Sequence, residues 1–344
     1  MGYDFTAEEL MMQKMARDFS QQEIRPVALI MDQDPEGEGD KIFWDLWRRA
    51  AELGLIGVFV PERFGGAEAS MITTTLIGEE LAAADAGFAV SVGVNWLIQG
   101  ILMLEGDVDV QEKYLPMISS DQALPVGGCY TEPGGGSDVA SVKRAGPGSI
   151  NTTYRKVDGG YIINGTKSFV TNGGRACFYM VMATEDVARG GQTASKFIVP
   201  ADLPGVTVGR IENKMGIRSS TTAQISFADV FVSAENLLGL EYGAIPHYEF
   251  MGSVSRGPVG GIAVGIARAA YEEALAFAKD RIQGGKTIIE HQGIGLTLAE
   301  MLMFIEVGRA IVQKSAWTSL QFDRNPMERL KLACIAKTFC SEMV

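Results

Sequence analysis

A glycine run lies near the middle of the chain, in the segment Cys129–Asp138, which reads CYTEPGGGSD. Three successive glycines allow the backbone to turn tightly and to approach a ligand closely. Together with Ser137, they offer neighbouring N–H groups and a hydroxyl to an anion or a carbonyl. A tight surface turn without a ligand explains the run equally well on local physics. The pattern is neither a G-x-G-x-x-G dinucleotide fingerprint nor a P-loop.

Length, charge and residue counts limit the class of protein to which this chain can belong. The 344 residues exceed what one hydrophobic core usually serves, so two or three domains are expected. A net charge of −12 argues against nucleic acid as a partner, although local basic residues could hold a phosphorylated small ligand. Four scattered cysteines and two histidines predict neither a disulfide framework nor a metal site.

The same composition gives an expectation for localisation. Scattered cysteines fit a reduced compartment. The N-terminus does not read as a signal peptide, and we expect no membrane-spanning segment. The sequence therefore predicts a cytoplasmic protein.

Residues 1–122 predict helices. Thr6 followed by Glu9 is the pattern of a capping box, which starts a helix. A second amphipathic period places Phe43, Leu46, Ala50 and Leu53 on one helix face, and the glycine that follows ends it. Packing of these helices into a bundle is the expected outcome.

Residues 125–235 predict antiparallel β structure. The segment GGYIINGTKSFVTNGG has strand residues bounded by Asn-Gly turns. Alternation in AQISFADVFV slips near Asp229, which predicts a β-bulge there. Strands and helices do not alternate along this region, so a Rossmann domain is disfavoured.

Residues 240–344 return to a helical pattern. Apolar residues recur in helical phase at Leu298, Met301, Leu302, Ile305 and Val312. Such helices suit a buried four-helix bundle, and an intrachain core or a subunit interface would both explain the small residues. The fold class is therefore α+β, with predicted domains at 1–122, 123–238 and 239–344.

Two central segments, YTEPGGGSD and INGTKSFVTNGG, resemble the paired flavin-binding signature of the acyl-CoA dehydrogenase family. VPERFGG, KMGIRSS, ISFADVFVSAENLLG, the stretch from SRGPVGG to AKDR and EHQGIGLTLAEM match the same family in order. The resemblance covers essentially the whole chain. It implies an N-terminal helical domain, a central antiparallel β-barrel domain and a C-terminal four-helix bundle, which would be incomplete in this chain.

The resemblance implies FAD as the cofactor and gives each signature residue a role. Cys129, Tyr130 and Thr131 match a strand whose backbone and hydroxyl groups bond the pyrimidine side of the flavin. Gly136 and Ser137 match the turn that approaches the cofactor and the acyl-CoA. The matched segment that lies against the flavin is Phe169, Val170 and Thr171. There the aromatic ring keeps one face dry and Thr171 supports charge near N5.

Further matches imply a substrate site and a site shared between subunits. Arg256 matches a CoA-contacting arginine, preceded by Ser253, Val254 and Ser255. The residues matched to the FAD site of a neighbouring subunit are Arg281, Gln283, His291 and Gln292. Gly284 departs from the phenylalanine usual in the family. Alternatively, Arg256 and Arg281 could form ordinary surface ion pairs, and His291 could have a packing or capping role.

The implied reaction is α,β-dehydrogenation of an acyl-CoA thioester. A carboxylate removes the α-proton while hydride leaves the β-carbon for flavin N5. Electrons then pass to an electron-transferring flavoprotein, and the protein is a homo-oligomer, expected to be a tetramer. The family's usual glutamate would follow Val344, so the catalytic base is unassigned and we expect a truncated chain. A noncatalytic partner subunit or scaffold and a flavin-dependent oxidase are the alternatives.

Overall fold

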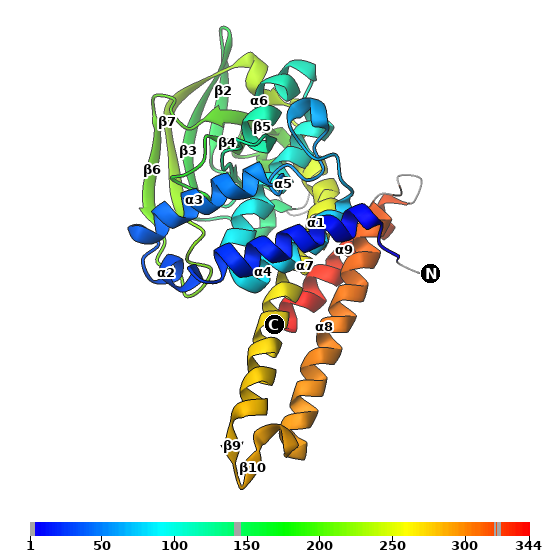
Figure 1. Cartoon of the computed structure of the whole chain (residues 1–344). Coiled ribbons are helices and arrows are strands. Elements are labelled where there is room, and N and C mark those ends of the chain that lie inside the picture. Colours follow the sequence, from blue (N-terminus) through cyan, green and yellow to red (C-terminus); the bar gives the residue numbers. More distant parts are fainter. Residues whose placement is uncertain (1–3, 141–145, 320, 322–324) are drawn as a thin grey trace. The chain divides into compact units, whose positions relative to one another are not determined.

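The computed structural model describes residues 4–140, 146–319, 321 and 325–344 (Figure 1). It contains two compact units, each built from separate stretches of sequence. Unit 1 comprises Met1–Leu29, Ser70–Val90 and Gly252–Val344. Unit 2 comprises Ile30–Ala69 and Ser91–Met251. The predicted N-terminal helices therefore contribute to both units.

The elements follow one another in an α, β, α order, as the sequence predicts. The α-helices are α1 (Ala7–Phe19), α2 (Ala28–Gln33), α3 (Glu38–Glu52), α4 (Met71–Ala84), α5 (Ala86–Glu105), α6 (Val108–Ser119), α7 (Ala244–Asp280), α8 (Gln292–Ser319) and α9 (Pro326–Glu342). The strands are β1 (Gly127–Cys129), β2 (Thr153–Val157), β3 (Gly160–Thr171), β4 (Phe178–Thr184), β5 (Ala194–Pro200), β6 (Val206–Ile211), β7 (Thr222–Ser233), β8 (Leu237–Leu238), β9 (Ile282–Gln283) and β10 (Lys286–Thr287).

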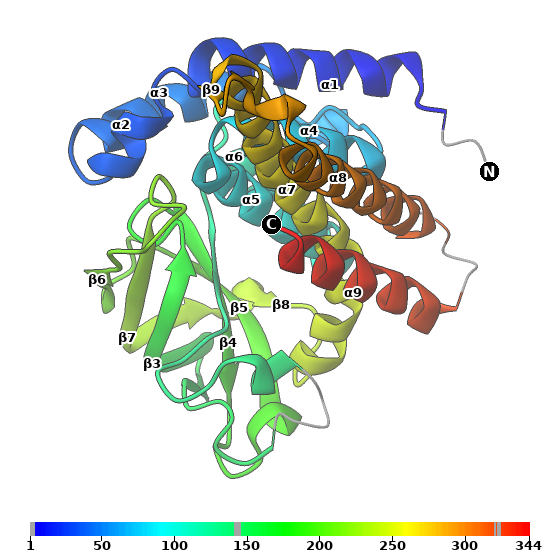
Figure 2. The same ribbon diagram turned by 90° about the horizontal axis from the view of Figure 1, so that it is seen from below.

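Unit 2 is organised by a sheet of the order β6-β7-β3-β2-β4-β5-β8, with β1 added beside β4. Figure 2 shows β6, β7, β3 and β4 across this sheet. Most neighbours are antiparallel, as expected, but β1 and β2 run parallel to β4. Buried aromatic and aliphatic side chains of the strands form the core of this unit, among them Tyr154, Ile163, Val181, Phe197 and Ile225.

The bulge predicted near Asp229 is present. Ile163 pairs with Val230 and Gly165 pairs with Phe227, so Asn164 faces two residues of β7. Asp229 has a φ of 50°, and its N–H donates to Asn164 Oδ1 at 2.8 Å. Asn164 Nδ2 donates back to the Asp229 carboxylate at 3.0 Å. The side-chain amide thus replaces the ladder bonds that the extra residue interrupts.

Helix α5 differs from expectation, because its 20 residues are long and apolar enough to cross a membrane by length and composition. Most of its apolar window, 61%, is nevertheless buried inside the protein. Two buried amides interrupt its apolar surface in unit 2. Asn95 donates to the Leu124 carbonyl at 2.8 Å, and Gln99 donates to the Ile118 carbonyl at 2.6 Å. These bonds identify α5 as a helix that organises the surrounding loops.

Unit 1 is helical, and its first helix begins with the predicted capping box of Thr6 and Glu9. Two arginines of unit 1 form ion pairs with Glu80, a buried residue of α4. Arg17 and Arg268 donate to the Glu80 carboxylate at 2.7 and 2.6 Å. Val264 of α7 packs with Ile305 and Val312 of α8 in one apolar cluster. The two helices extend together as an arm (Figure 1).

The arm ends in a β-hairpin, which the helical expectation for residues 240–344 missed. Gln283 pairs with Lys286 across the turn residues Gly284 and Gly285. Both glycines have a positive φ, 65° and 82°, as tight two-residue hairpin turns require. The departure at Gly284 therefore has a conformational cause. The predicted phase of α8 holds for its buried residues, whereas Leu302 is exposed.

Candidate functional site

The end of β3 carries the most unusual backbone among the predicted residues of unit 2. Phe169 has a φ of 57°, and its side chain is 60% exposed. A bulky residue rarely adopts this left-handed conformation, because its Cβ crowds the backbone. Val170 is buried and Thr171 is half-buried. An exposed aromatic ring on a strained backbone is typical of a residue held for contact with a ligand.

Asn172 fixes this strand end from the buried side. Its side-chain amide donates to the carbonyls of Ser91 and Val126 at 3.2 and 3.0 Å. Its backbone N–H donates to the Thr221 carbonyl at 2.9 Å. Asn172 also has a φ of 60°, a conformation that asparagine tolerates better than most residues. The residue after Thr171 therefore anchors the edge, a role that sequence reasoning missed.

The segment Cys129–Thr131 lies beside this edge, as the resemblance implies. Cys129 ends β1, and the Ser168 N–H donates to the Thr131 carbonyl at 2.8 Å. Tyr130 is half-buried. Burial raises the pKa of the Cys129 thiol to about 12, which agrees with a packing role for this thiol. The structure thus brings Cys129–Thr131 and Phe169–Thr171 together within unit 2.

A buried ion pair joins the same two segments. Lys167 Nζ donates to Glu132 Oε1 at 2.8 Å and to the Tyr130 carbonyl at 3.2 Å. The Glu132 carboxylate also accepts from the N–H groups of Asn151 and Thr152, at 2.6 and 2.9 Å. Burial lowers the pKa of Lys167, while Glu132 opposes that effect.

The pKa of Glu132 shows the opposite balance. Burial acts to raise it, but Lys167 and the two backbone donors outweigh burial and hold it below its usual range. Glu132 is therefore a carboxylate at neutral pH, and Lys167 Nζ donates to it. Strand alternation could have revealed that Lys167 is buried, because it shares its strand face with buried Tyr161 and Ile163, but not which residue it meets.

The glycine run serves two different purposes. Gly135 is buried, and a Cβ there would lie 2.8 Å from the Ser149 carbonyl oxygen. Packing therefore requires this glycine, whereas the sequence alone explains the run only by a tight turn and a close approach to a ligand. A Cβ on Gly134 or Gly136 would meet nothing within 4 Å, and neither residue has a positive φ. Only these two glycines leave room for a ligand to approach the backbone.

Two N–H groups of the run are already used within the chain. Gly135 donates to the Glu132 carbonyl at 3.2 Å, and Gly136 donates to Asp138 Oδ1 at 2.7 Å. Ser137 is exposed and begins a 3-10 turn. The run therefore offers fewer N–H donors to an anion than the sequence predicted. Ser137 adds an exposed hydroxyl beside it.

The predicted substrate residues of unit 1 lie near the start of its α7 segment. Arg256 Nη1 donates to Cys334 Sγ of α9 at 3.2 Å. Ser253 is buried, and Ser255 and Arg256 are half-buried. The side chain of Val254 lies outside the described residues.

The predicted residues of the shared FAD site gather at the hairpin end of the arm. Arg281 donates to the Gln283 side chain at 3.5 Å, and His291 Nε2 lies 2.9 Å from the Gln283 carbonyl oxygen. Gln292 begins α8 beside them. Arg256 lies on α7 and Arg281 directly follows its last residue, 25 positions later, which at 1.5 Å per residue is about 37 Å along the helix axis. The hairpin group and Arg256 therefore serve different places along one chain.

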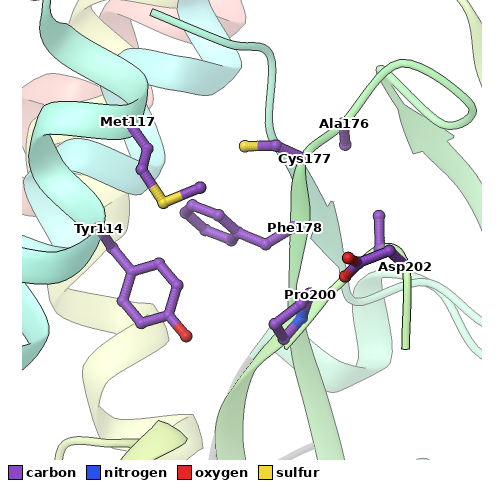
Figure 3. A pocket seen from close by; sticks show the side chains of 8 residues that line it. Tyr114, Met117, Ala176, Cys177, Phe178, Pro200 and Asp202 are labelled. Carbon is purple, nitrogen blue, oxygen red and sulfur yellow. The ribbon is translucent and has the colours of Figure 1, made fainter. Parts of the chain in front are cut away.

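A hollow of about 500 Å³ lies elsewhere in unit 2 (Figure 3). Tyr114 and Met117 of α6 face Phe178 there, and the rings of Tyr114 and Phe178 meet edge-on at 5.1 Å. Cys177 also lines it, and burial raises the pKa of that thiol to about 12. The hollow contains none of the predicted site residues.

Family models match three consecutive stretches of the chain. They are the N-terminal domain of acyl-CoA dehydrogenase at residues 6–122, its middle domain at 127–230 and its C-terminal domain at 252–344. The chain belongs to the acyl-CoA dehydrogenase family. The α+β architecture and the resemblance found in the sequence are thereby confirmed.

Individual relatives of this acyl-CoA dehydrogenase family member match nearly all of the chain. An acyl-CoA dehydrogenase of Bacillus subtilis is 34% identical, over 98% of this chain and 84% of its own length. The rat short/branched chain specific acyl-CoA dehydrogenase is 32% identical, over 98% and 74%. Butyryl-CoA dehydrogenase from Megasphaera elsdenii is 31% identical with a TM-score of 0.90, over 100% of this chain and 86% of its own.

Proposed function

We propose that this protein is an FAD-dependent acyl-CoA dehydrogenase that introduces an α,β double bond into an acyl-CoA thioester. The names of the matched relatives, which include a butyryl-CoA dehydrogenase, support this reaction class. The observation that carries the proposal is the exposed Phe169 on its left-handed backbone, beside the half-buried Thr171. A β-bulge accounts for the backbone, because the pairing of β3 with β7 shifts between Lys167 and Val170. Exposure of the aromatic ring at that bulge is what a planar ligand against the edge explains.

The described residues fit a flavin. Open space beside Gly134 and Gly136 lets the backbone approach a ligand. The proposed FAD contacts in unit 2 are Cys129, Tyr130, Thr131, Gly136, Ser137, Phe169, Val170 and Thr171. Bound FAD supplies the two-electron oxidation. The ring of Phe169 excludes water from one side, and Thr171 donates a hydrogen bond toward developing charge.

The acyl-CoA is assigned to Ser137, Ser253, Val254, Ser255 and Arg256. A guanidinium suits phosphate or carbonyl oxygens, because its planar N–H groups donate in a fixed geometry. Donors near the thioester carbonyl make the α-proton more acidic. The base stays unassigned.

We further propose a homo-oligomer, a tetramer by family resemblance, that works in the cytoplasm. Arg281, Gln283, His291 and Gln292 would bind the FAD of a neighbouring subunit. The separation of about 37 Å supports this, because it puts the hairpin residues far along the chain from the proposed substrate residues around Arg256. Exposed apolar side chains along the arm, such as Phe277 and Leu296, also favour a protein neighbour.

Electrons are proposed to leave through an electron-transferring flavoprotein. A chain in a solved structure from work on the electron transferring flavoprotein of Acidaminococcus fermentans is 29% identical, with a TM-score of 0.90. An oxidase is the second candidate. The prolyl acyl carrier protein oxidase AnaB is 26% identical, with a TM-score of 0.86.

Anaerobic titration of the purified yellow protein with acyl-CoAs tests the function. Loss of the yellow absorbance of oxidised flavin, with formation of the enoyl-CoA, is the expected result. Rapid reoxidation by oxygen with release of peroxide would favour the oxidase. Flavin that no acyl-CoA bleaches would favour a noncatalytic partner subunit. A protein that stays colourless with added FAD would remove the cofactor assignment.

A further inference from the structure

Lys167 contacts a peptide group of the proposed flavin site without pointing at the site itself. Its ammonium donates to the Tyr130 carbonyl at 3.2 Å. That carbonyl and the Thr131 N–H belong to the same peptide group. A cation at the carbonyl oxygen draws electron density toward it, and the N–H of the same peptide becomes a stronger donor.

We propose that Lys167 is a positioning residue that strengthens the Thr131 N–H as a donor to the flavin and so raises the flavin reduction potential. This inference rests on the proposed function, in which backbone groups of Cys129–Thr131 bond the pyrimidine side. Reduction places negative charge on that side of the ring. A stronger donor there stabilises the reduced form more than the oxidised form.

The geometry holds the ammonium in place. The Lys167 side chain is fully buried, and so is its partner Glu132. Two backbone N–H groups, from Asn151 and Thr152, bind the same carboxylate and prevent it from rotating. The next peptide group along the chain is tied to β3, because its Thr131 carbonyl accepts from the Ser168 N–H. Ordinary thermal motion therefore does not remove the ammonium from the Tyr130 carbonyl.

A second buried pair provides the control that separates this role from a structural one. Lys196 of β5 pairs with Glu105, and both side chains are almost fully buried in unit 2. Burial lowers the pKa of Lys196, as it does for Lys167. Lys196→Met therefore removes a comparable buried cation from the same sheet. It leaves the Tyr130–Thr131 peptide and its lysine contact unchanged.

The experiment measures the flavin midpoint potential of wild type, Lys167→Met and Lys196→Met, by dye equilibration. We expect Lys167→Met to shift the two-electron equilibrium at least tenfold toward oxidised flavin, which is about 30 mV lower. Lys196→Met should match wild type. The double variant Glu132→Gln/Lys167→Met removes the unpaired charge, so it tests the same shift if the single variant folds poorly.

Two outcomes overturn the inference while leaving the proposed function intact. One is a potential for both Lys167 variants equal to that of wild type. The other is an equal shift in Lys196→Met, which would show that any buried cation of the sheet has this effect. A wild-type protein that binds no FAD would overturn both the proposed function and this inference. Thermal unfolding of each flavin-loaded variant, recorded in parallel, shows that the measured protein is folded.

Discussion

Arg256 of α7 donates to the sulfur of Cys334 of α9 at 3.2 Å. Sulfur is a weak acceptor, and a guanidinium has five N–H donors, so this contact orients the side chain without using its capacity. A Cβ on Gly252, one helical turn earlier, would lie 2.5 Å from Arg256 Nη1. The glycine therefore provides the space in which the guanidinium folds back toward α9.

Arg256→Gln is expected to raise the KM for acyl-CoA about tenfold to a hundredfold, because a hydrogen bond from a charged donor contributes about 1.5–3 kcal/mol. Cys334→Ala should raise it only a few-fold, since Arg256 keeps its charge and loses only orientation. Steady-state kinetics with a short-chain acyl-CoA measure both. Equal effects of the two variants would contradict the assignment of Arg256 to the substrate.

The glycine run gives a second prediction, in which neighbouring positions behave oppositely. Gly135→Ala forces a Cβ against the Ser149 carbonyl oxygen and should lower the free energy of unfolding by about 1–3 kcal/mol. Gly134→Ala has open space and should change it by less than about 0.5 kcal/mol. Urea denaturation of the apoprotein distinguishes them.

A third prediction concerns ligand binding at the two exposed glycines of the run, Gly134 and Gly136. Gly136→Ala is expected to weaken binding of FAD or acyl-CoA with little effect on stability, because its methyl group would occupy the space of the ligand. Gly134→Ala is the adjacent control with the same open surroundings. Unchanged binding of both ligands by both variants would mean that the run is only a surface turn.

Phe169→Asn should stabilise the apoprotein and weaken FAD binding. Asparagine tolerates a φ near 57°, so the substitution relieves strain of about 1 kcal/mol. Loss of the ring contact should weaken FAD binding about tenfold. Phe231→Asn is the control, since Phe231 is an exposed phenylalanine of the same sheet, at 48%. Apoprotein melting and flavin fluorescence titration give the two quantities, and tighter binding by Phe169→Asn would refute the role of the ring.

Local signals predicted much of the fold. Thr6 and Glu9 marked a helix start because a capping box needs only four adjacent residues, and Asp229 marked a bulge because alternation fails there. The hairpin at Gly284 was missed because flanking helical periodicity on both sides concealed two strands of two residues each. Long-range contacts were also missed. No local pattern shows that Lys167 meets Glu132, since 35 positions separate them.

The last prediction concerns Lys214, whose ammonium donates to the Ser220 carbonyl at 2.6 Å and to Thr222 Oγ1 at 2.9 Å. Burial, together with the positive charge of Arg175, lowers the pKa of Lys214 to about 8. The unfolded chain has an ordinary lysine pKa of about 10.4. Between these values the unfolded state binds more protons, so the free energy of unfolding should rise as pH increases from 8 to 10.

Lys214→Met removes this contribution. The difference in free energy of unfolding, wild type minus Lys214→Met, should therefore grow as pH increases from 8 to 10. It should be constant below pH 7, where both states hold the proton. Urea unfolding measures this difference at about pH 6, 7, 8, 9 and 10, which covers the window and a reference range below it. A difference that stays constant up to pH 10 would show that the folded state protonates Lys214 as readily as the unfolded chain does.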